Sequence, residues 1–338
     1  MTTIMSETTA ASRYQVADKA PRTLADMLLR WETILVGLLA LTIIVNSTLT
    51  PYFLDRDNLL DATFNFSEKA MIALAMALVI IVRDIDLSVA AIVALASLTM
   101  GLVAQSGANA GVLLAVALGT GAACGAINGA LVTGLALPAI VVTIGTMSLF
   151  RGVAQVVLGD QALTQYPDGL LAIGQGYVGA NVPYSFATFL VLALVVGFVL
   201  HKTPLGRRIF AIGSNPEAAR FSGIPVARIR FGLFVFSGLL SGLAAWFLTG
   251  RIGSTRPNIA QGWELEAVTM AILGGVSIAG GSGTIPGVTL AVFVLGLTTF
   301  GMSLMNVPGI VINVLLGLLL ITVLAAPILA RRFLLLRN

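Results

Sequence analysis

Long apolar runs follow one another along most of this chain and are separated by short polar segments. A helix of about 20 apolar residues is long enough to cross the hydrocarbon core of a bilayer. The pattern therefore predicts an all-α polytopic membrane protein with about ten transmembrane helices, or eight if a re-entrant pair counts as one element. The predicted spans are residues 31–50, 64–82, 87–105, 110–133, 138–158, 185–200, 231–249, 266–280, 284–304 and 308–330.

The composition of the chain supports this class. Of its 338 residues, 57% are hydrophobic and 10% are charged, whereas soluble domains have about 25% charged residues. In a membrane protein, a net charge of +4 mainly records basic cytoplasmic loops, so it does not indicate a nucleic-acid partner. The single cysteine, Cys124, excludes an internal disulfide, and we expect it to be a small buried side chain.

The basic residues give a topology. Thirteen of the 19 Lys and Arg residues lie in the first 30 residues, in 201–230 and after residue 330, and the positive-inside rule places these segments in the cytoplasm. Six predicted spans precede the middle cluster and four follow it, which is consistent with this placement. The predicted domains are a cytoplasmic N-terminal tail (1–27), a transmembrane permease domain (28–330, with a cytoplasmic coupling loop at 201–230) and a cytoplasmic C-terminal tail (331–338).

The polar loop 201–230 contains the signals of a short helix. Either Ser214 or Asn215 can cap its first free N–H groups, and Glu217 suits the positive end of the helix dipole. Gly223 is a helix stop. A helix of about two turns is not stable alone in water, so we predict a docking helix for a soluble partner, the alternative being a solvated connector. The docking residues are Asn215, Pro216, Glu217, Ala218, Ala219, Arg220, Phe221 and Gly223.

Several kinds of chemistry have no signal in the sequence. None of the three lysines, Lys19, Lys69 and Lys202, follows the glycines of a P-loop, so ATP is not expected to bind this chain by that route. His201 is the only histidine, and we expect it to be an interfacial residue. The chain is therefore predicted to be no enzyme, with no catalytic residue, metal or cofactor.

Most ionisable residues of the predicted spans lie near span ends. Glu68 and Lys69 are adjacent and are expected to pair with neighbouring helices or to extend toward the outer surface. Arg151 is expected to extend to the outer surface as well. We find no chain of buried carboxylates of the kind that proton- or sodium-coupled carriers often use. This weakens the alternative that the chain is an ion-coupled carrier.

Other polar residues are assigned from their position in the spans. Asp86 or Ser88 can cap the third span at a cytoplasmic turn, and a gating role for this turn is the alternative. Asn128, Thr143 and Thr146 are candidates for lining a pathway, although hydroxyl side chains in spans often bond a neighbouring helix instead.

Glycines recur at four-residue spacing in two of the spans. Gly121, Gly125 and Gly129 lie on one face of the fourth span, and Gly238 and Gly242 repeat the spacing in the seventh. Small residues allow close helix packing, so we predict a contact within the subunit, with a dimer interface as the alternative. A further glycine-rich stretch, 273–287, is expected to form a tight turn or a flexible joint on the cytoplasmic side.

Four motifs resemble those of a known family. They are GSNPEAARFSGI (213–224), IDLSV (85–89), TIGTMSLFRG (143–152) and LGGVSIAGGSGTIPG (273–287). The first resembles the EAA-type loop of ABC importer permeases, and the others resemble the ribose/xylose/autoinducer-2 branch of carbohydrate permeases, over roughly residues 55–330. Family members usually have two glycines where this chain has Arg83 and Asp84.

The resemblance implies a multi-pass subunit of the bacterial inner membrane with both termini in the cytoplasm. It implies three kinds of protein partner besides membrane lipids, namely cytoplasmic ATP-binding subunits, a periplasmic sugar-binding protein and a second permease subunit in a homo- or heterodimer. No nucleic acid is implied. The transported solute would be a pentose, hexose or deoxyhexose such as rhamnose. Alternating access would be driven by the partner ATPases through the helix at 216–222.

The outer loops would then have to recognise the loaded binding protein. Their charged residues Arg251, Arg256, Glu264 and Glu266 are the predicted contacts, because charges at the rim of an interface steer docking. The alternative function is an ion-coupled secondary carrier or a channel for a small polar solute.

Overall fold

The computed structural model of the chain describes residues 30–179 and 181–335. Its described part is almost entirely helical, as predicted, with one two-stranded hairpin on the outer side. The elements are α2 (Trp31–Leu49), α3 (Arg56–Ile81), α4 (Val89–Ala104), α5 (Ala110–Gly134), α6 (Ala139–Leu158), α7 (Asp168–Gly174), β1 (Tyr177–Val178), β2 (Val182–Pro183), α8 (Tyr184–Lys202), α9 (Pro204–Ser214), α10 (Pro216–Phe221), α11 (Val226–Ile252), α12 (Trp263–Leu273), α13 (Ile285–Leu304) and α14 (Gly309–Leu335).

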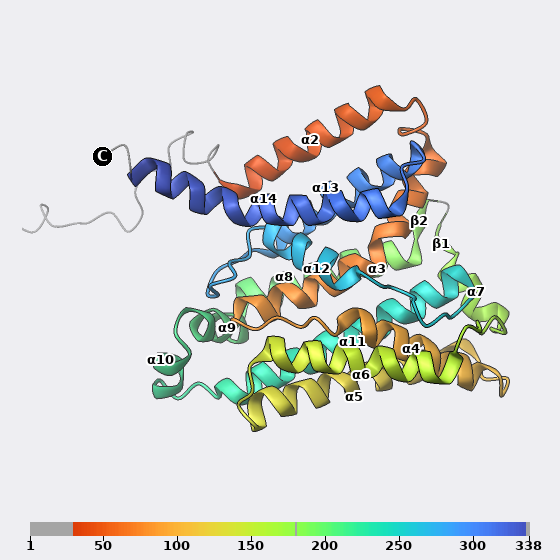
Figure 1. The fold of residues 1–338 in the computed structure, drawn as a ribbon, viewed down its shortest axis with the longest axis horizontal. Coiled ribbons are helices and arrows are strands. Elements are labelled where there is room, and N and C mark those ends of the chain that lie inside the picture. Colours follow the sequence, from red (N-terminus) through yellow and green to blue (C-terminus); the bar gives the residue numbers. More distant parts are fainter. Residues whose placement is uncertain (1–29, 180, 336–338) are drawn as a thin grey trace, which may run out of the picture.

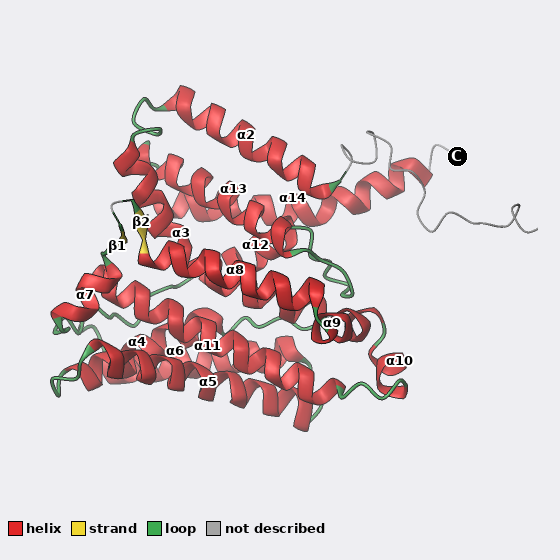
Figure 2. Ribbon diagram, turned by 180° about the vertical axis from the view of Figure 1, so that it is seen from behind, coloured by secondary structure: helices red, strands yellow, loops and turns green. Residues whose placement is uncertain are grey.

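The long helices lie roughly side by side (Figure 1), with α2, α13 and α14 in one group and α4, α5 and α6 in the opposite group. Helix α3 lies between the groups, and every residue from Ala70 to Val82 is buried. The same two groups are seen from behind in Figure 2, where α9 and α10 lie at one end of the bundle and α7 with the hairpin at the other. We call the α9–α10 end the inner end and the α7 end the outer end.

In the described residues, seven helices are long and apolar enough to cross a membrane. They are α2, α3, α5, α6, α8, α11 and α13. Helix α4 and the apolar part of α14, Gly309–Thr322, are shorter. The predicted N-terminal tail (1–27) lies outside the described residues, and the predicted C-terminal tail begins within α14, with only 336–338 outside.

The predicted span 266–280 is wrong as a continuous helix. Helix α12 ends at Leu273, and the chain then turns at Gly275, whose φ is +88°. Gly274 also packs against the backbone of α13, because a Cβ there would lie 2.5 Å from the Cα of Val288. The apolar run therefore contains a short helix followed by a tight turn, which agrees with the turn predicted for 273–287.

Two segments interrupt the helical bundle. Residues 82–88, which we call the inner break, run between α3 and α4. Residues 253–262, the outer break, run between α11 and α12. Non-helical backbone at membrane depth is tolerated only where protein buries it or where it lines a water-filled cavity, so the contacts of these two segments bear on function.

The two predicted glycine rows meet each other. A Cβ on Gly121 would overlap the carbonyl oxygen of Gly238, and one on Gly125 would overlap that of Phe234. Gly242 in turn leaves room only for the backbone at Ala117. Helices α5 and α11 thus pack backbone to backbone within one subunit, which confirms the first of the two interpretations. Cys124 is buried beside this contact, as predicted.

Candidate functional site

The predicted docking helix is present as α10, and its capping residue is now defined. The side chain of Asn215 accepts a hydrogen bond from the backbone N–H of Ala218 at 3.0 Å. Ser214 instead ends the preceding helix and donates its hydroxyl to the carbonyl of Phe210. Gly223, with φ +80°, takes the left-handed conformation that ends the helix.

Most side chains of helix α10 are exposed. Phe221 is 91% exposed, and Glu217 and Arg220 are exposed as well, whereas Ala219 faces inward and is buried. An exposed phenylalanine at the tip of a short helix is the kind of apolar anchor that fills a pocket on a partner protein. The geometry therefore agrees with a docking helix, and the docking role itself stays a prediction.

Helix α9, which the sequence analysis did not predict, fixes α10 to the bundle. Thr203 caps it by accepting from the N–H of Gly206, and Pro204 is its first residue. Its Gly206 and Gly213 are buried against backbone, Gly206 on Leu200 and Gly213 on Ile81. Helix α9 is amphipathic, because Ile209 and Ile212 are buried while Arg207 and Arg208 are exposed. A search for long apolar runs therefore did not detect it.

Arg83 binds the C-terminal end of α9. Its Nε donates to the carbonyl of Gly213 and its Nη2 to that of Ser214, both at 2.6 Å. These carbonyls belong to the last turn of a helix, where a cation is favourable. Arg83 has a φ of +70°, a conformation natural for glycine and uncommon for other residues. This chain therefore has an anchoring side chain at a position whose backbone conformation suits glycine.

Asp84 holds the other end of the coupling loop. Its carboxylate receives two hydrogen bonds from the guanidinium of Arg230, at 2.6 and 2.7 Å. Arg230 is the last residue of this loop and lies in the second turn of α11. Adjacent residues at the start of the inner break thus bind both ends of the segment that carries α10.

The glycine-rich turn after α12 completes this junction. The N–H of Gly281 donates to the carbonyl of Ile81 at 2.9 Å. A Cβ on Gly281 would lie 2.7 Å from the Oγ of Ser214. This stretch thus lies beside the coupling loop, and its close backbone contacts indicate a tightly packed turn.

The inner break ends in a buried polar cluster, so Asp86 does not lie at a cytoplasmic surface turn. Asp86 accepts from the N–H and hydroxyl of Ser88 through Oδ1 and from the hydroxyl of Ser237 through Oδ2. Asn128 donates to the hydroxyl of Ser88 at 2.7 Å. All four side chains are fully buried. Among the described residues, the only backbone N–H that Asp86 binds is that of Ser88, the residue before α4, so neither Asp86 nor Ser88 caps this helix with its side chain as predicted; the cluster instead joins the inner break to α5 and α11.

The other two pathway candidates lie beside this cluster. Thr143 on α6 donates to the carbonyl of Ile85 at 3.1 Å, and Thr146 contacts the carbonyl of Thr143. Both are buried. Asn128 and Thr143 thus hold the inner break in place, and a role in lining a pathway stays a prediction for all three residues.

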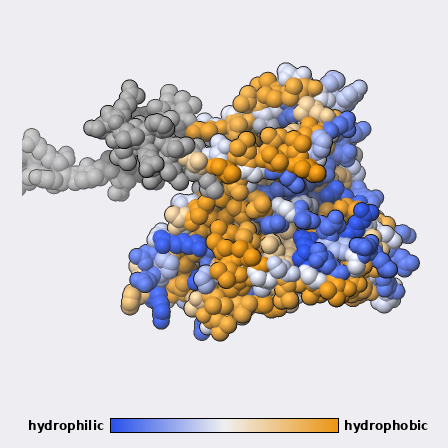
Figure 3. Space-filling view, viewed as in Figure 1, coloured by the Kyte–Doolittle hydropathy of each residue, from blue (hydrophilic) through white to orange (hydrophobic). Residues whose placement is uncertain are grey.

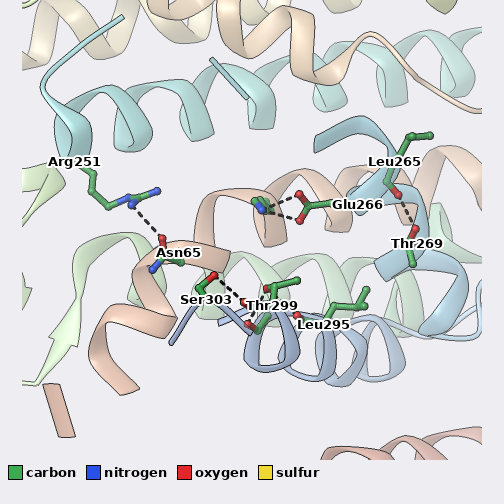
Figure 4. A network of polar contacts seen from close by, with 10 residues as sticks. Asn65, Arg251, Leu265, Glu266, Thr269, Leu295, Thr299 and Ser303 are labelled. Atoms are coloured by element: carbon green, nitrogen blue, oxygen red, sulfur yellow. Dashed lines mark hydrogen bonds and ion pairs between the residues drawn. The ribbon is translucent and has the colours of Figure 1, made fainter. Parts of the chain in front are cut away.

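Two ion pairs cross the outer half of the bundle. Glu68, which is fully buried rather than placed at a span end, pairs with Arg251 at 2.8 Å. Lys69 pairs with Glu266 at 2.7 Å and also lies over the ring of Trp263. The prediction that Glu68 and Lys69 pair with neighbouring helices is confirmed. In Figure 4, Arg251 extends toward Asn65, and the dashed lines at the Glu266 carboxylate are its bonds to Lys69. Asn65, Lys69, Arg251 and Glu266 line a cavity of 390 Å³ beside Thr299 and Ser303.

The four residues predicted to contact the binding protein differ in their exposure and their partners. Arg251 and Glu266 are held in these internal ion pairs. Arg256 in the outer break is exposed and lines an outer polar recess of 650 Å³ with Gln155, Asp160 and Asn258. Glu264 is half-buried, and its Oε2 has no hydrogen-bond partner among the described residues.

Hydroxyl groups and one arginine hold the outer break. Arg151 does not extend to the outer surface; its Nη1 donates to the carbonyls of Pro257 and Ile259 at 2.9 and 2.7 Å. The hydroxyl of Thr255 contacts Ser97 and Tyr166. Burial raises the pKa of Tyr166, so the phenol stays neutral. The backbone of Thr255 also pairs with Leu163.

Chemistry of other kinds has little support in the part of the chain that the structure describes. No group of three His, Cys, Asp or Glu residues there could hold a metal ion. His201 lies at the end of α8, where its Nε2 accepts from the N–H of Ile285 at the start of α13.

Comparison with known proteins gives a consistent result. The sequence model of the family described as "Branched-chain amino acid transport system / permease component" matches residues 58–324. The chain is 34% identical over 299 residues to the autoinducer 2 import system permease protein LsrD of Escherichia coli (strain K12) and to that of Shigella flexneri. Each alignment covers 87% of this chain and 90% of the relative. No solved structure matches significantly.

Proposed function

This chain belongs to the permease family of the branched-chain amino acid transport system type, and we propose that it is the membrane subunit of an ATP-driven importer for a sugar-like solute. The family match confirms the resemblance to ABC importer permeases. In this proposal, a binding protein delivers the solute outside, ATP-binding subunits act inside, and the chain itself supplies the pathway.

The attachment of α10 to the inner break carries this proposal. The side of α10 that faces away from the bundle is exposed. Arg83 and Asp84 bind the chain segments that precede and follow α10. A partner that moves α10 therefore moves the end of α9 and the start of α11 together. The inner break should move with these two helix ends, because Arg83 and Asp84 belong to it.

Motion of the inner break would change the pathway through the polar cluster around Asp86. The cluster joins the break to α5 through Asn128 and to α11 through Ser237. Helices α5 and α11 form a rigid pair through their glycine contact. Closure of the ATP-binding subunits would then move the break against this pair and switch access from the outer to the inner side.

A second permease subunit fits the polar face of the molecule. Figure 3 shows a hydrophilic area that extends from the outer end into the middle of the face between α13 and α6. Polar side chains that line the outer recess there are Gln155, Asp160, Gln161, Arg256 and Asn258. Lipid hydrocarbon would not supply hydrogen-bond partners for these polar side chains. We therefore place a second permease subunit over this face, with the solute passing between the two.

The proposed topology has ten crossings with both termini in the cytoplasm of a bacterial inner membrane. Seven crossings are the long helices. The other three are α14, the inner break with α4, and the outer break with α12, because each break adds extended length to a short helix. An even number of crossings then lies between each pair of basic segments.

The solute is proposed to be a small polyhydroxylated molecule, from a pentose to a deoxyhexose such as rhamnose. Relatives at 34% identity are named as autoinducer 2 import permeases. Uptake of radiolabelled candidate solutes by cells that express the chain together with candidate ATP-binding and binding proteins identifies the solute.

Deletion of the ATP-binding subunit tests the function directly. We expect solute uptake to stop, while a dissipated ion gradient leaves uptake unchanged as long as ATP is present. Glu217→Lys in α10 should give the same loss, by at least tenfold, with normal membrane insertion; Asp57→Lys, at an exposed acidic residue in the first turn of α3, is the matched control. Uptake that continues without the ATP-binding subunit and stops with the gradient would make the chain an ion-coupled carrier instead.

A further inference from the structure

An apolar groove lies between α8 and α11 at the inner end of the bundle. Its volume is 430 Å³. Figure 2 shows α8 and α11 from this side, with α9 next to the inner ends of both. The lining comes from four helices: Leu78 of α3; Val195, Val196, Val199 and Leu200 of α8; Leu205 and Ile209 of α9; and Arg228, Ile229, Gly232, Leu233 and Phe236 of α11.

The groove is shaped for a flexible hydrocarbon chain. Except for Arg228, its lining side chains are apolar or, at Gly232, absent. A Cβ on Gly232 would meet nothing within 4 Å, so this position leaves the groove open. The groove also lies on the opposite face from the polar area of Figure 3, since Figure 2 views the molecule from behind. The bilayer, rather than a second subunit, therefore borders it.

Arg228 places a cation at the mouth of this groove. The same residue lines a second recess of 790 Å³ on the inner side, together with Arg220 and Arg230. Arg230 is neutralised by Asp84, but Arg220 and Arg228 have no acidic partner among the described residues. The mouth of the groove is therefore positively charged, at the depth where the headgroups of the cytoplasmic leaflet lie.

Helix α9 adds to this charge. Arg208 follows Leu205 by three residues, so it shares the side of α9 that lines the groove. An amphipathic helix with arginines beside an apolar face lies in the interface of a membrane and is attracted to anionic lipid.

We propose that this groove is a binding site for one anionic phospholipid of the cytoplasmic leaflet. An acyl chain lies between α8 and α11, and the phosphate of the headgroup is bound by Arg228, with Arg208 and Arg220 adding to the attraction. The groove lies outside the proposed solute pathway, and its assignment to the cytoplasmic leaflet rests on the proposed function and topology.

Lipid retention by the purified full-length protein tests this site. Native mass spectrometry after exchange into mild detergent measures the bound phospholipid, and titration with phosphatidylglycerol, phosphatidylcholine or inorganic phosphate gives relative affinities. We expect one phosphatidylglycerol to be retained in preference to phosphatidylcholine. Arg228→Gln should weaken its binding about fivefold, because a basic residue near an anionic surface contributes about that factor.

Gly232→Leu should weaken binding by tenfold or more, since each methylene kept out of an apolar site costs about a factor of four. Gly37→Leu on exposed α2, also with open space for a Cβ, and Arg256→Gln on the outer side are matched controls and should bind normally. Should Gly232→Leu not fold, Leu205→Ser on the opposite wall of the groove replaces it.

Three results would overturn the proposal. The first is equal retention of phosphatidylglycerol by both groove variants and the wild type. The second is displacement by inorganic phosphate together with no effect of Gly232→Leu, which would indicate an ion site on the arginines alone. The third is equal binding of phosphatidylcholine and phosphatidylglycerol, which would indicate a lipid-filled groove without headgroup recognition.

Discussion

The inner break and the outer break both replace part of a membrane span with extended backbone, but different groups hold them. Two charged side chains of the inner break, Arg83 and Asp84, bind the ends of the loop that carries α10. The outer break receives its contacts from within the bundle and from the outer cap, through Arg151, Ser97 and Tyr166. The inner break is thus linked to the α9–α10 end of the bundle and the outer break to the α7 end.

This difference assigns separate tasks to the two ends. A change in the contacts of the inner break should alter the link between ATP hydrolysis and transport. A change around the outer break should alter stability or the response to a binding protein. Variants that affect one end without the other therefore test the comparison.

The largest effect is expected at the ion pair beneath the outer break. Arg251→Ala would leave the fully buried carboxylate of Glu68 without its cation, and loss of one partner of a buried pair costs about 3–5 kcal/mol. Unfolding of the purified protein in detergent measures this loss. The double variant Glu68→Gln/Arg251→Gln should recover most of the stability, and equal losses in both variants would contradict the assignment of the cost to an unpaired charge.

A somewhat smaller loss of stability is expected at the inner break. Asp84→Ala leaves Arg230 unpaired, but the arginine side chain is 28% exposed, so water offsets part of the penalty and about 2 kcal/mol remains. Import should fall by at least tenfold, because α11 is released from the break. The conservative double variant Asp84→Asn/Arg230→Gln is the control; full import by Asp84→Ala would remove this contact from the mechanism.

Thr255→Val in the outer break should have a modest effect. The hydroxyl contacts Ser97 and Tyr166, and a lost hydrogen bond of this kind costs about 1 kcal/mol. Thermal unfolding should shift slightly, while the amount of solute imported per ATP stays at the wild-type value. A large fall in that ratio would mean that the outer break, too, takes part in coupling to ATP.

The smallest effect is expected from the exposed Arg256. Arg256→Glu should weaken association with the binding protein several-fold at low salt and less at high salt, mainly through a slower association rate. Surface plasmon resonance at two ionic strengths measures it. Arg207→Glu on the inner side is the control, and an affinity independent of salt would exclude Arg256 from the docking surface.

The sequence predicted the elements whose signal is local. The apolar runs predicted most spans, and the cap and stop at Asn215 and Gly223 predicted α10. Spacing alone also predicted that the two glycine rows pack helices within one subunit, since small residues at four-residue intervals lie on one helix face.

The breaks and their contacts could not be predicted in this way. The run 266–280 appeared continuous because its glycines are also apolar, whereas in the structure α12 ends at Leu273 and Gly275 takes a left-handed conformation. Arg151 looked like a residue that extends outward, because the carbonyls of Pro257 and Ile259 that it binds are more than 100 positions away along the chain. The partners of Arg83 and Asp84, at Gly213, Ser214 and Arg230, are likewise distant along the chain.

The link between α10 and the inner break is the central claim, and the number of solute molecules imported per ATP hydrolysed tests it most directly. The measurement uses liposomes that contain the complete importer with either wild-type permease or Arg83→Ala, whose exposed position spares the fold. We predict that ATP hydrolysis stays within twofold of the wild type while import falls at least tenfold. An unchanged ratio of import to hydrolysis would contradict the claim.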